Sequence, residues 1–147
     1  MTRTRLRALP LLALTTLLVG CEQDTILGFA IGDISGLWIG MSYVYTEVTP
    51  TQAPSVDLIE RDGARFTMVV DNMPRPPIVS TTFADGMGNE VSGGGTIDIV
   101  VGTMLIRDVL YTIDHDGDRM TITTDEMMFD FGSGMRPAVL TIVLDRA

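Results

Sequence analysis

Three Asp-Gly pairs, at residues 62–63, 85–86 and 116–117, separate runs in which apolar and polar residues alternate. Alternation with a period of two is typical of half-buried strands. Asp-Gly between such runs favours a tight hairpin, because a type I′ turn needs positive φ at both central residues. Thr, Val, Ile and Gly are abundant, and no long helical period is present. The chain is therefore predicted to be all-β and antiparallel.

Eight strands are predicted, joined mostly by short turns. Their ranges are 36–48, 55–61, 64–71, 77–84, 95–101, 104–113, 118–131 and 138–146. An open meander of this kind would expose two edges, whereas closure into a barrel removes both. The predicted fold is an eight-stranded antiparallel up-and-down barrel, with an interior that side chains fill or that holds one small ligand.

Two of the hairpins can be assigned a register. Folding the chain about Asp62-Gly63 places Glu60 opposite Arg65 on the outside and Ile59 opposite Phe66 on the inside. This pairing suits a strand with one buried face. The following strand then has an inward row of apolar residues: Ala64, Phe66, Met68 and Val70.

The second hairpin is folded about Asp116-Gly117. It opposes the pairs Asp114–Arg119, Thr112–Thr121, Ile113–Met120, Tyr111–Ile122 and Arg107–Glu126. The acidic residues at this turn also suggest a calcium loop. An EF-hand loop, however, has glycine at position six and glutamate at position twelve. Here Gly117 is fourth from Asp114 and the twelfth residue is Asp125, so we predict a turn and no metal.

Arg3, Arg5 and Arg7 precede an almost wholly apolar run from Leu9 to Val19. This run has the length of a signal-peptide core and is shorter than the ~20 residues that span a bilayer as a helix. Residues 1–20 are therefore predicted to be a secretory signal peptide.

The apolar run ends in Leu18-Val19-Gly20-Cys21, which contains the only cysteine of the chain. This ending resembles the lipobox of bacterial lipoproteins. The resemblance implies cleavage before Cys21 and attachment of a diacylglycerol to its thiol, and it gives a purpose to an unpaired thiol in an exported chain. We therefore expect a membrane anchor at Cys21, a tether over 21–33 and a barrel domain over 34–147.

The residue after the cysteine, Glu22, is a poor match to the inner-membrane retention signal, which is normally Asp. The expected location is the bacterial cell envelope, at the outer membrane facing the periplasm. Removing residues 1–20 takes away three of the ten basic residues and none of the 19 acidic ones, so the net charge falls from −9 to −12. Such an acidic surface repels phosphate backbones, and nucleic-acid binding is not expected.

The first strand begins Gly36-Leu37-Trp38. This sequence resembles the Gly-x-Trp opening of lipocalins and of lipocalin-like bacterial proteins. The resemblance implies that Trp38 plugs one end of the barrel and that an Arg of the last strand packs across its ring. Arg146 shares the face of the apolar row of the last strand, and a cation–π contact with Trp38 would accommodate its charge.

The face of the first strand that points inward is ambiguous. If Trp38 points inward, the strict alternation places small residues inside and an apolar stripe outside: Leu37, Ile39, Met41, Tyr43 and Tyr45. If the stripe points inward, Trp38 lies outside. An exposed stripe would favour a protein partner.

The residues give little support for catalysis. The only histidine, His115, is expected at a hairpin tip, where a base would lack a fixed geometry. The chain is rich in methionine, and thioethers suit Cu(I). Only Met73, Met87 and Met135 are expected in loops, since gap filling explains strand methionines better. We predict no enzyme, cofactor or metal.

The leading functional hypothesis is binding of a small apolar ligand inside the barrel. The candidate ligand-binding residues are Phe66, Met68, Arg107, Tyr111, Ile122 and Glu126, with Tyr43 or Tyr45 added from the first strand. A carrier should have a closed apolar cavity of ~300 Å³ or more. The alternative is a protein–protein interaction module, such as an envelope assembly accessory or an inhibitor of an exported enzyme, with a filled barrel, no ligand and an exposed apolar patch.

Overall fold

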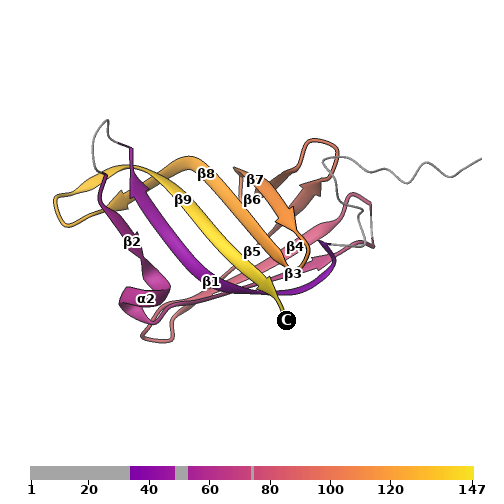
Figure 1. Cartoon of the computed structure of the whole chain (residues 1–147), viewed down its shortest axis with the longest axis horizontal. Helices are drawn as coiled ribbons and strands as arrows, with labels where there is room; N and C mark the ends of the chain where they lie inside the picture. The colour runs from indigo at the N-terminus through magenta and orange to yellow at the C-terminus, as the bar shows by residue number, and fades with distance from the viewer. Residues whose placement is uncertain (1–33, 49–52, 74) are drawn as a thin grey trace, which may run out of the picture.

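The structure is a computed structural model that describes residues 34–48, 53–73 and 75–147 (Figure 1). The predicted signal peptide, the tether and the lipidation site Cys21 lie outside the described residues. No helix within the described part of the chain is long and apolar enough to cross a membrane.

The described residues form strands almost throughout. The elements are β1 (Gly36–Glu47), β2 (Ser55–Asp57), α2 (Leu58–Asp62), β3 (Arg65–Asp71), β4 (Ile78–Ala84), β5 (Glu90–Asp98), β6 (Thr103–Ile106), β7 (Val109–Asp116), β8 (Arg119–Asp130) and β9 (Met135–Arg146).

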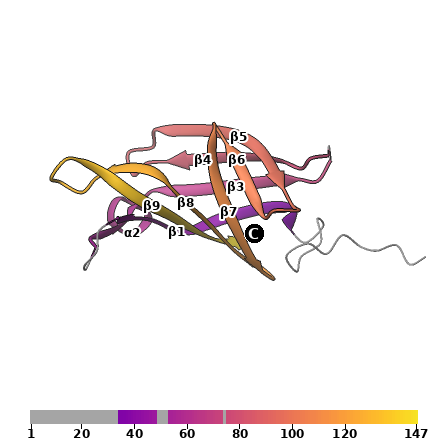
Figure 2. The ribbon, with the colours of Figure 1, turned by 90° about the horizontal axis from the view of Figure 1, so that it is seen from above.

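Antiparallel pairing of each strand with the next, from β3 through β9, gives one continuous sheet. The first strand pairs with β3 on one side and with β9 on the other, from Trp38 opposite Arg146 to Glu47 opposite Ala138. This last pairing closes an eight-stranded barrel, so the predicted fold class is confirmed. Figures 1 and 2 show β8, β9 and β1 crossing steeply over β3, β4 and β5.

The predicted hairpin about Asp62-Gly63 is wrong. Only β2 of the expected strand 55–61 forms, and it pairs with β1 instead of β3. Asp57 ends β2 and caps the short helix α2, because its carboxylate accepts the Ile59 N–H at 2.9 Å. Gly63 then ends the helix at φ 67°. A glycine with positive φ serves a helix C-cap as well as a hairpin turn, and the sequence pattern does not separate the two. The inward row of β3 is nevertheless confirmed, because Ala64, Phe66, Met68 and Val70 are all buried.

The hairpin between β7 and β8 is confirmed, but its predicted register is wrong by two residues. Asp116 pairs with Arg119, so the loop is Gly117-Asp118. Of these loop residues only Gly117 has a positive φ, 61°, whereas the predicted loop needed two such residues. A shift of two keeps the side chains on their predicted faces as far as Thr124, where a register shift in β8 interrupts the alternation. His115 consequently lies within β7, opposite Met120, and not at a hairpin tip.

Two further strand predictions are wrong. The expected strand 104–113 is divided into β6 and β7 by a two-residue turn at Arg107-Asp108. The expected strand 95–101 is β5, which begins much earlier, at Glu90. Gly93 and Gly94 read as the end of a loop because glycine has low strand propensity. These glycines remain in the strand because pairing with β4 and β6 holds them.

The ambiguity of the first strand is resolved by a β-bulge between Gly40 and Ser42. Before the bulge Trp38 points inward and Leu37, Ile39 and Met41 are exposed; after it, Tyr45 is buried and Tyr43 is partly buried. One extra residue reverses the alternation of a strand. Each of the two predicted orientations therefore holds for one half of β1.

The barrel has a closed end, which contains the start of β1 and the end of β9. Trp38 fills this end and is fully buried. Its indole N–H donates to the Ile34 carbonyl oxygen at 2.9 Å, and the His115 ring stands edge-on with a centroid distance of 5.6 Å. The predicted cation–π contact is present, with the guanidinium carbon of Arg146 4.4 Å from the Trp38 ring centroid.

Hydrogen bonds hold the Arg146 guanidinium over the indole. Its Nη1 donates to the Ser35 carbonyl oxygen at 2.6 Å, and its Nε donates to the Asp118 carboxylate at 3.1 Å. One arginine thus connects the beginning of β1, the end of β9 and the β7–β8 turn.

Replacing this arginine should destabilise the barrel. Arg146→Gln removes the cation–π contact and both hydrogen bonds, and we expect it to lower the free energy of unfolding by about 1–3 kcal/mol. Arg119→Gln is the matched control, because its ion pair with Asp145 is exposed and is worth less than ~1 kcal/mol. Urea unfolding followed by the fluorescence of Trp38 measures both. Equal losses in the two variants would contradict a stabilising role for the Trp38 contact.

Candidate ligand-binding cavity

The open half of the barrel contains a cavity of about 140 Å³ that communicates with solvent. Every one of the eight barrel strands contributes to its wall, so the cavity is the barrel lumen. The lining residues are Tyr43 from β1, Phe66 from β3, Thr81 and Phe83 from β4, Val91 and Gly93 from β5, Ile106 from β6, Arg107 from the β6–β7 turn, Tyr111 from β7, Ile122 from β8 and Ile142 from β9.

The floor of the cavity is apolar and the rim is polar. Four buried side chains form the floor: Phe66, Ile106, Ile122 and Ile142. Tyr43 and Tyr111 are partly buried, whereas Arg107 is exposed and lies at the rim. A site of this kind offers hydrophobic surface below and a few hydrogen-bonding groups above.

The barrel wall extends least far toward the open end at the β6–β7 hairpin. Toward the open end, the last paired residues are Gly95 with Ile106 and Thr112 with Thr123. Both β5 and β8 continue beyond these pairs, and there they pair on their other sides only. The short hairpin therefore leaves a gap in the wall, and the Arg107-Asp108 turn forms its lower edge.

The backbone of this turn is unusual for its sequence. Arg107 has φ 47° and Asp108 has φ 65°, as a two-residue type I′ turn requires. Asp tolerates positive φ better than most residues, but Arg has no such preference. The turn directs the Arg107 side chain back over the lumen, where its guanidinium donates to the Ser92 carbonyl oxygen of β5.

Gly93 allows close packing in the wall of the cavity. A Cβ atom at this position would lie 2.8 Å from Thr81 Oγ1 and 3.2 Å from Ile106 Cγ2, whereas its distance of 3.6 Å from Arg107 Nε would be an ordinary contact. The first distance is shorter than real Cβ contacts, so a side chain here would displace part of the cavity wall. The glycine therefore lets the Thr81 and Ile106 side chains pack closely against β5.

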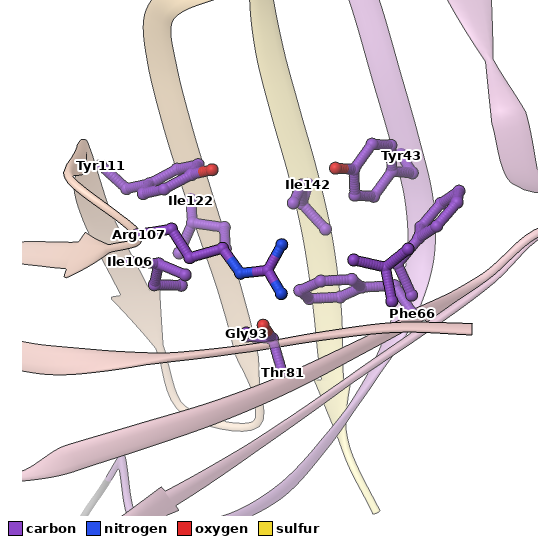
Figure 3. Close-up of a pocket in the computed structure, with 11 residues that line it drawn as sticks. Tyr43, Phe66, Thr81, Gly93, Ile106, Arg107, Tyr111, Ile122 and Ile142 are labelled. Atoms are coloured by element: carbon purple, nitrogen blue, oxygen red, sulfur yellow. The ribbon is translucent and has the colours of Figure 1, made fainter.

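Side chains with hydroxyl groups lie around the Arg107 guanidinium. Figure 3 shows the phenol oxygens of Tyr43 and Tyr111 directed toward each other above the Arg107 guanidinium, with Thr81 below it. Burial raises the pKa of Tyr43, and the nearby Tyr45 raises it further. Burial also raises the pKa of Tyr111. A tyrosine phenol is protonated at neutral pH even without such a shift, so the two higher pKa values only extend this protonation to more alkaline pH.

Aromatic rings continue from the cavity toward the β8–β9 turn. Tyr43 lies 5.0 Å from Phe83 and 5.7 Å from Tyr45, measured between ring centroids. Tyr45 stacks on Phe129 at 4.2 Å, with an angle of 13° between the planes. These contacts make the cavity wall near β1 rigid.

The structure brings most of the predicted ligand-binding residues together. Phe66, Arg107, Tyr111 and Ile122 line the cavity. Met68 is fully buried in the core toward the closed end and does not line it. Of the two first-strand tyrosines, Tyr43 lines the cavity and Tyr45 packs beside it.

The predicted pair of Arg107 and Glu126 is wrong. Glu126 is exposed, and its carboxylate accepts the Leu110 N–H at 3.4 Å. It lies in a separate surface depression outside the barrel wall. The pairing fails because the turn at Arg107-Asp108 ends β6, so that residue 107 is never opposite β8.

Sequence reasoning missed part of the lining: Thr81, Phe83, Val91, Gly93, Ile106 and Ile142. The alternation on the last strand already places Ile142 in the apolar row with Leu140 and Leu144, so this residue could have been found. Gly93 could not, because its segment reads as a loop.

The groups suspected of metal or catalytic chemistry lie apart from the cavity. Within the described ranges, no cluster of three or more His, Cys, Asp or Glu side chains could hold a metal ion. His115 packs on Trp38 at the closed end. Met73 and Met87 are exposed in connections at opposite ends of the barrel, and Met135 is exposed at the start of β9.

A larger groove of about 380 Å³ lies outside the barrel, between Arg75-Pro76-Pro77 and the segment from Thr96 to Val100. It borders residue 74, which lies outside the described residues. It involves only two short segments of the chain, whereas all eight barrel strands line the lumen, so the lumen is the stronger candidate site.

Comparison of the chain with protein-family models, with curated proteins and with solved structures finds no match.

A methyl group at Gly93 should disturb the cavity wall. Gly93→Ala should lower the free energy of unfolding by about 1–3 kcal/mol, because the new Cβ meets Thr81 and Ile106. Gly94→Ala is the control, because its Cβ would have only the Val79 carbonyl oxygen nearby, at 3.6 Å. It should be neutral or stabilise by up to ~1 kcal/mol. Urea denaturation compares the two, and similar values would contradict the tight approach at Gly93.

Proposed function

We propose that the chain is a non-catalytic binding module that holds a small apolar ligand, or the apolar part of one, in the barrel lumen. The observation that carries this proposal is the cavity, to which all eight barrel strands contribute and whose floor is formed by four buried apolar side chains. An apolar pocket with a few hydrogen-bonding groups at its rim is the usual form of a small-molecule site.

The size of the cavity limits the ligand. At about 140 Å³ it is smaller than the ~300 Å³ expected of a carrier that encloses a drug-sized molecule. An apolar cavity of ~150 Å³ is large enough for benzene. The enclosed part of the ligand is therefore about as large as one aromatic ring or a short alkyl chain, and a longer ligand would extend through the gap beside β6 and β7.

The location of the module is also part of the proposal. We propose that the Cys21 thiol carries a lipid and that this anchor holds the barrel in the cell envelope, at the periplasmic face of the outer membrane. The lipobox-like Leu18-Val19-Gly20-Cys21 and the preceding apolar run support this. The acidic surface would be repelled by anionic lipid, so attachment would depend on the acyl chains.

A second candidate function is binding of an envelope protein. The exposed stripe on the outer face of β1 and β3 favours it: Leu37 is 44% exposed, Ile39 44%, Met41 53% and Val69 46%. Leu37 and Val69 are direct cross-strand neighbours, so these side chains are contiguous. The two functions use opposite faces of the wall and are compatible with each other.

A substitution that fills the cavity should weaken ligand binding. We expect Ile142→Phe to reduce the affinity for a fluorescent hydrophobic probe by about tenfold, because the larger side chain occupies space that the probe needs. Val143→Phe is the matched control, since residue 143 lies on the outer face of the same strand. Titration of the purified chain and competition by an unlabelled apolar compound measure the affinity.

Saturable, one-to-one binding that Ile142→Phe weakens and Val143→Phe preserves would support the lumen site. Absence of saturable binding by a folded, monodisperse chain would contradict it. Equal weakening by the two variants would contradict the lumen site, because residue 143 lies on the outer face of β9.

Removal of the cysteine thiol should release the chain from the membrane. Cys21→Ala should abolish incorporation of an alkyne-labelled fatty acid and move the chain from the membrane fraction to the soluble fraction, because no other cysteine is present. Labelling in cells followed by fractionation tests this. Labelling that persists in the variant would refute lipidation at Cys21.

A further inference from the structure

We infer that the ligand carries a single anionic head of the carboxylate type, bound at the rim by the Arg107 guanidinium and the Tyr111 hydroxyl, with its apolar part on the lumen floor. This inference rests on the proposed function, since it specifies the ligand class of the same cavity.

The Arg107 guanidinium has hydrogen-bond donors that remain available to a ligand. A guanidinium has five N–H groups, and it prefers planar, two-oxygen acceptors such as carboxylate. Arg107 gives one donor to the Ser92 carbonyl oxygen. Within the part of the chain that the structure describes, the ion pairs are formed by Arg61, Arg119, Arg136 and Arg146. No carboxylate of the described residues neutralises Arg107.

Side-chain hydroxyl groups converge on the space around the Arg107 guanidinium. The Tyr111 and Tyr43 hydroxyls point toward the space above the guanidinium, and Thr81 lies on its other side (Figure 3). A tyrosine phenol is protonated at neutral pH, and burial raises the pKa of Tyr43 and Tyr111 further, so Tyr111 can donate a hydrogen bond to an anionic oxygen. Charged acceptors strengthen such bonds, and the apolar floor lowers the local dielectric.

The turn that presents Arg107 has a strained backbone conformation. Arg107 adopts φ 47° without being a glycine, and strained conformations of this kind persist mainly at functional sites. The turn conformation directs one guanidinium over the lumen, where it donates to the Ser92 carbonyl oxygen.

The acidic surface of the protein favours a ligand head with one negative charge over a head with two. The chain has a formal net charge of −9, and Asp108 is adjacent to the site. Such a surface repels dianions more than monoanions. A monocarboxylate with a ring or a short alkyl chain therefore fits both the cavity and its surroundings.

A purely structural role for Arg107 makes a different prediction. The guanidinium covers the Ser92 carbonyl at the unpaired edge of β5, and this contact alone would stabilise the wall. In that case Arg107 would affect stability but would not distinguish an anion from a neutral molecule of the same shape.

The test compares benzoate with benzyl alcohol, which share one ring and differ in charge. The full chain is titrated with each compound, by calorimetry or by NMR of labelled tyrosine. We expect benzoate to bind about tenfold more tightly or better. Arg107→Asn should abolish this preference while benzyl alcohol still binds. Asn tolerates positive φ, so the turn is retained.

Two further variants complete the test. Arg65→Asn removes an equal charge from the outer face of β3 and should leave the preference unchanged. Tyr111→Phe keeps the ring and loses the hydroxyl, so it should reduce the preference for benzoate several-fold.

The outcomes separate the two levels of the proposal. Equal binding of benzoate and benzyl alcohol, or an unchanged preference in Arg107→Asn, would overturn the anionic head and leave the lumen site intact. Failure of both compounds to bind a chain with native Trp38 fluorescence would overturn the proposed function itself.

Discussion

The β-bulge between Gly40 and Ser42 is the constraint on which the architecture depends. A strand without a bulge would keep Trp38 and Tyr43 on opposite faces, because side chains alternate. The extra residue lets Trp38 fill one end of the barrel and Tyr43 line the lumen at the other. Gly40 suits this position, because a Cβ there would lie 2.9 Å from the Phe66 Cβ. At the bulge, β1 can therefore approach β3 closely. The barrel closes around Trp38 at one end and still has a cavity at the other.

Each half of the barrel contains an arginine, and the two arginines differ in how their charge is compensated. At the closed end Arg146 lies over Trp38 and is also held by the Ser35 carbonyl and the Asp118 carboxylate. Its charge is compensated within the chain, and the contact contributes to stability. At the open end Arg107 lies at the rim, donates to one backbone carbonyl oxygen and forms no ion pair with a carboxylate of the described residues. Because this guanidinium is exposed to solvent, its unused donors cost little in the free protein and remain available to a ligand of the proposed kind.

The sequence predicted the fold better than its details. Eight barrel strands were expected and eight are present, but two errors cancel in that number: residues 55–61 do not form a barrel strand, and residues 104–113 form two. The first error arises because Gly63 suits either a helix end or a hairpin. The second arises because no glycine marks the Arg107-Asp108 turn, so its positive φ values could not be inferred from residue preferences. Alternation placed Phe66, Tyr111 and Ile122 in the lumen correctly. It failed for Glu126 because the register of β8 shifts between Thr124 and Met127, and such an irregularity reverses the faces of a strand. Alternation identifies faces, whereas only the turn geometry sets which residues meet across strands.

The position of the cavity follows from an uneven distribution of pairing around the barrel. The strands β1, β8 and β9 each have 12 residues, whereas β6 has four. The long strands surround Trp38 and provide most of the hydrogen-bonded ladder, so stability is concentrated there. The opposite wall contains three consecutive glycines, a strained turn and the gap above β6 and β7. Such a wall would be a defect in a barrel that only had to be stable. Within the described residues, this wall leaves the lumen open to solvent while the ladder that closes β1 onto β9 stays intact, so a ligand of the proposed kind could enter there.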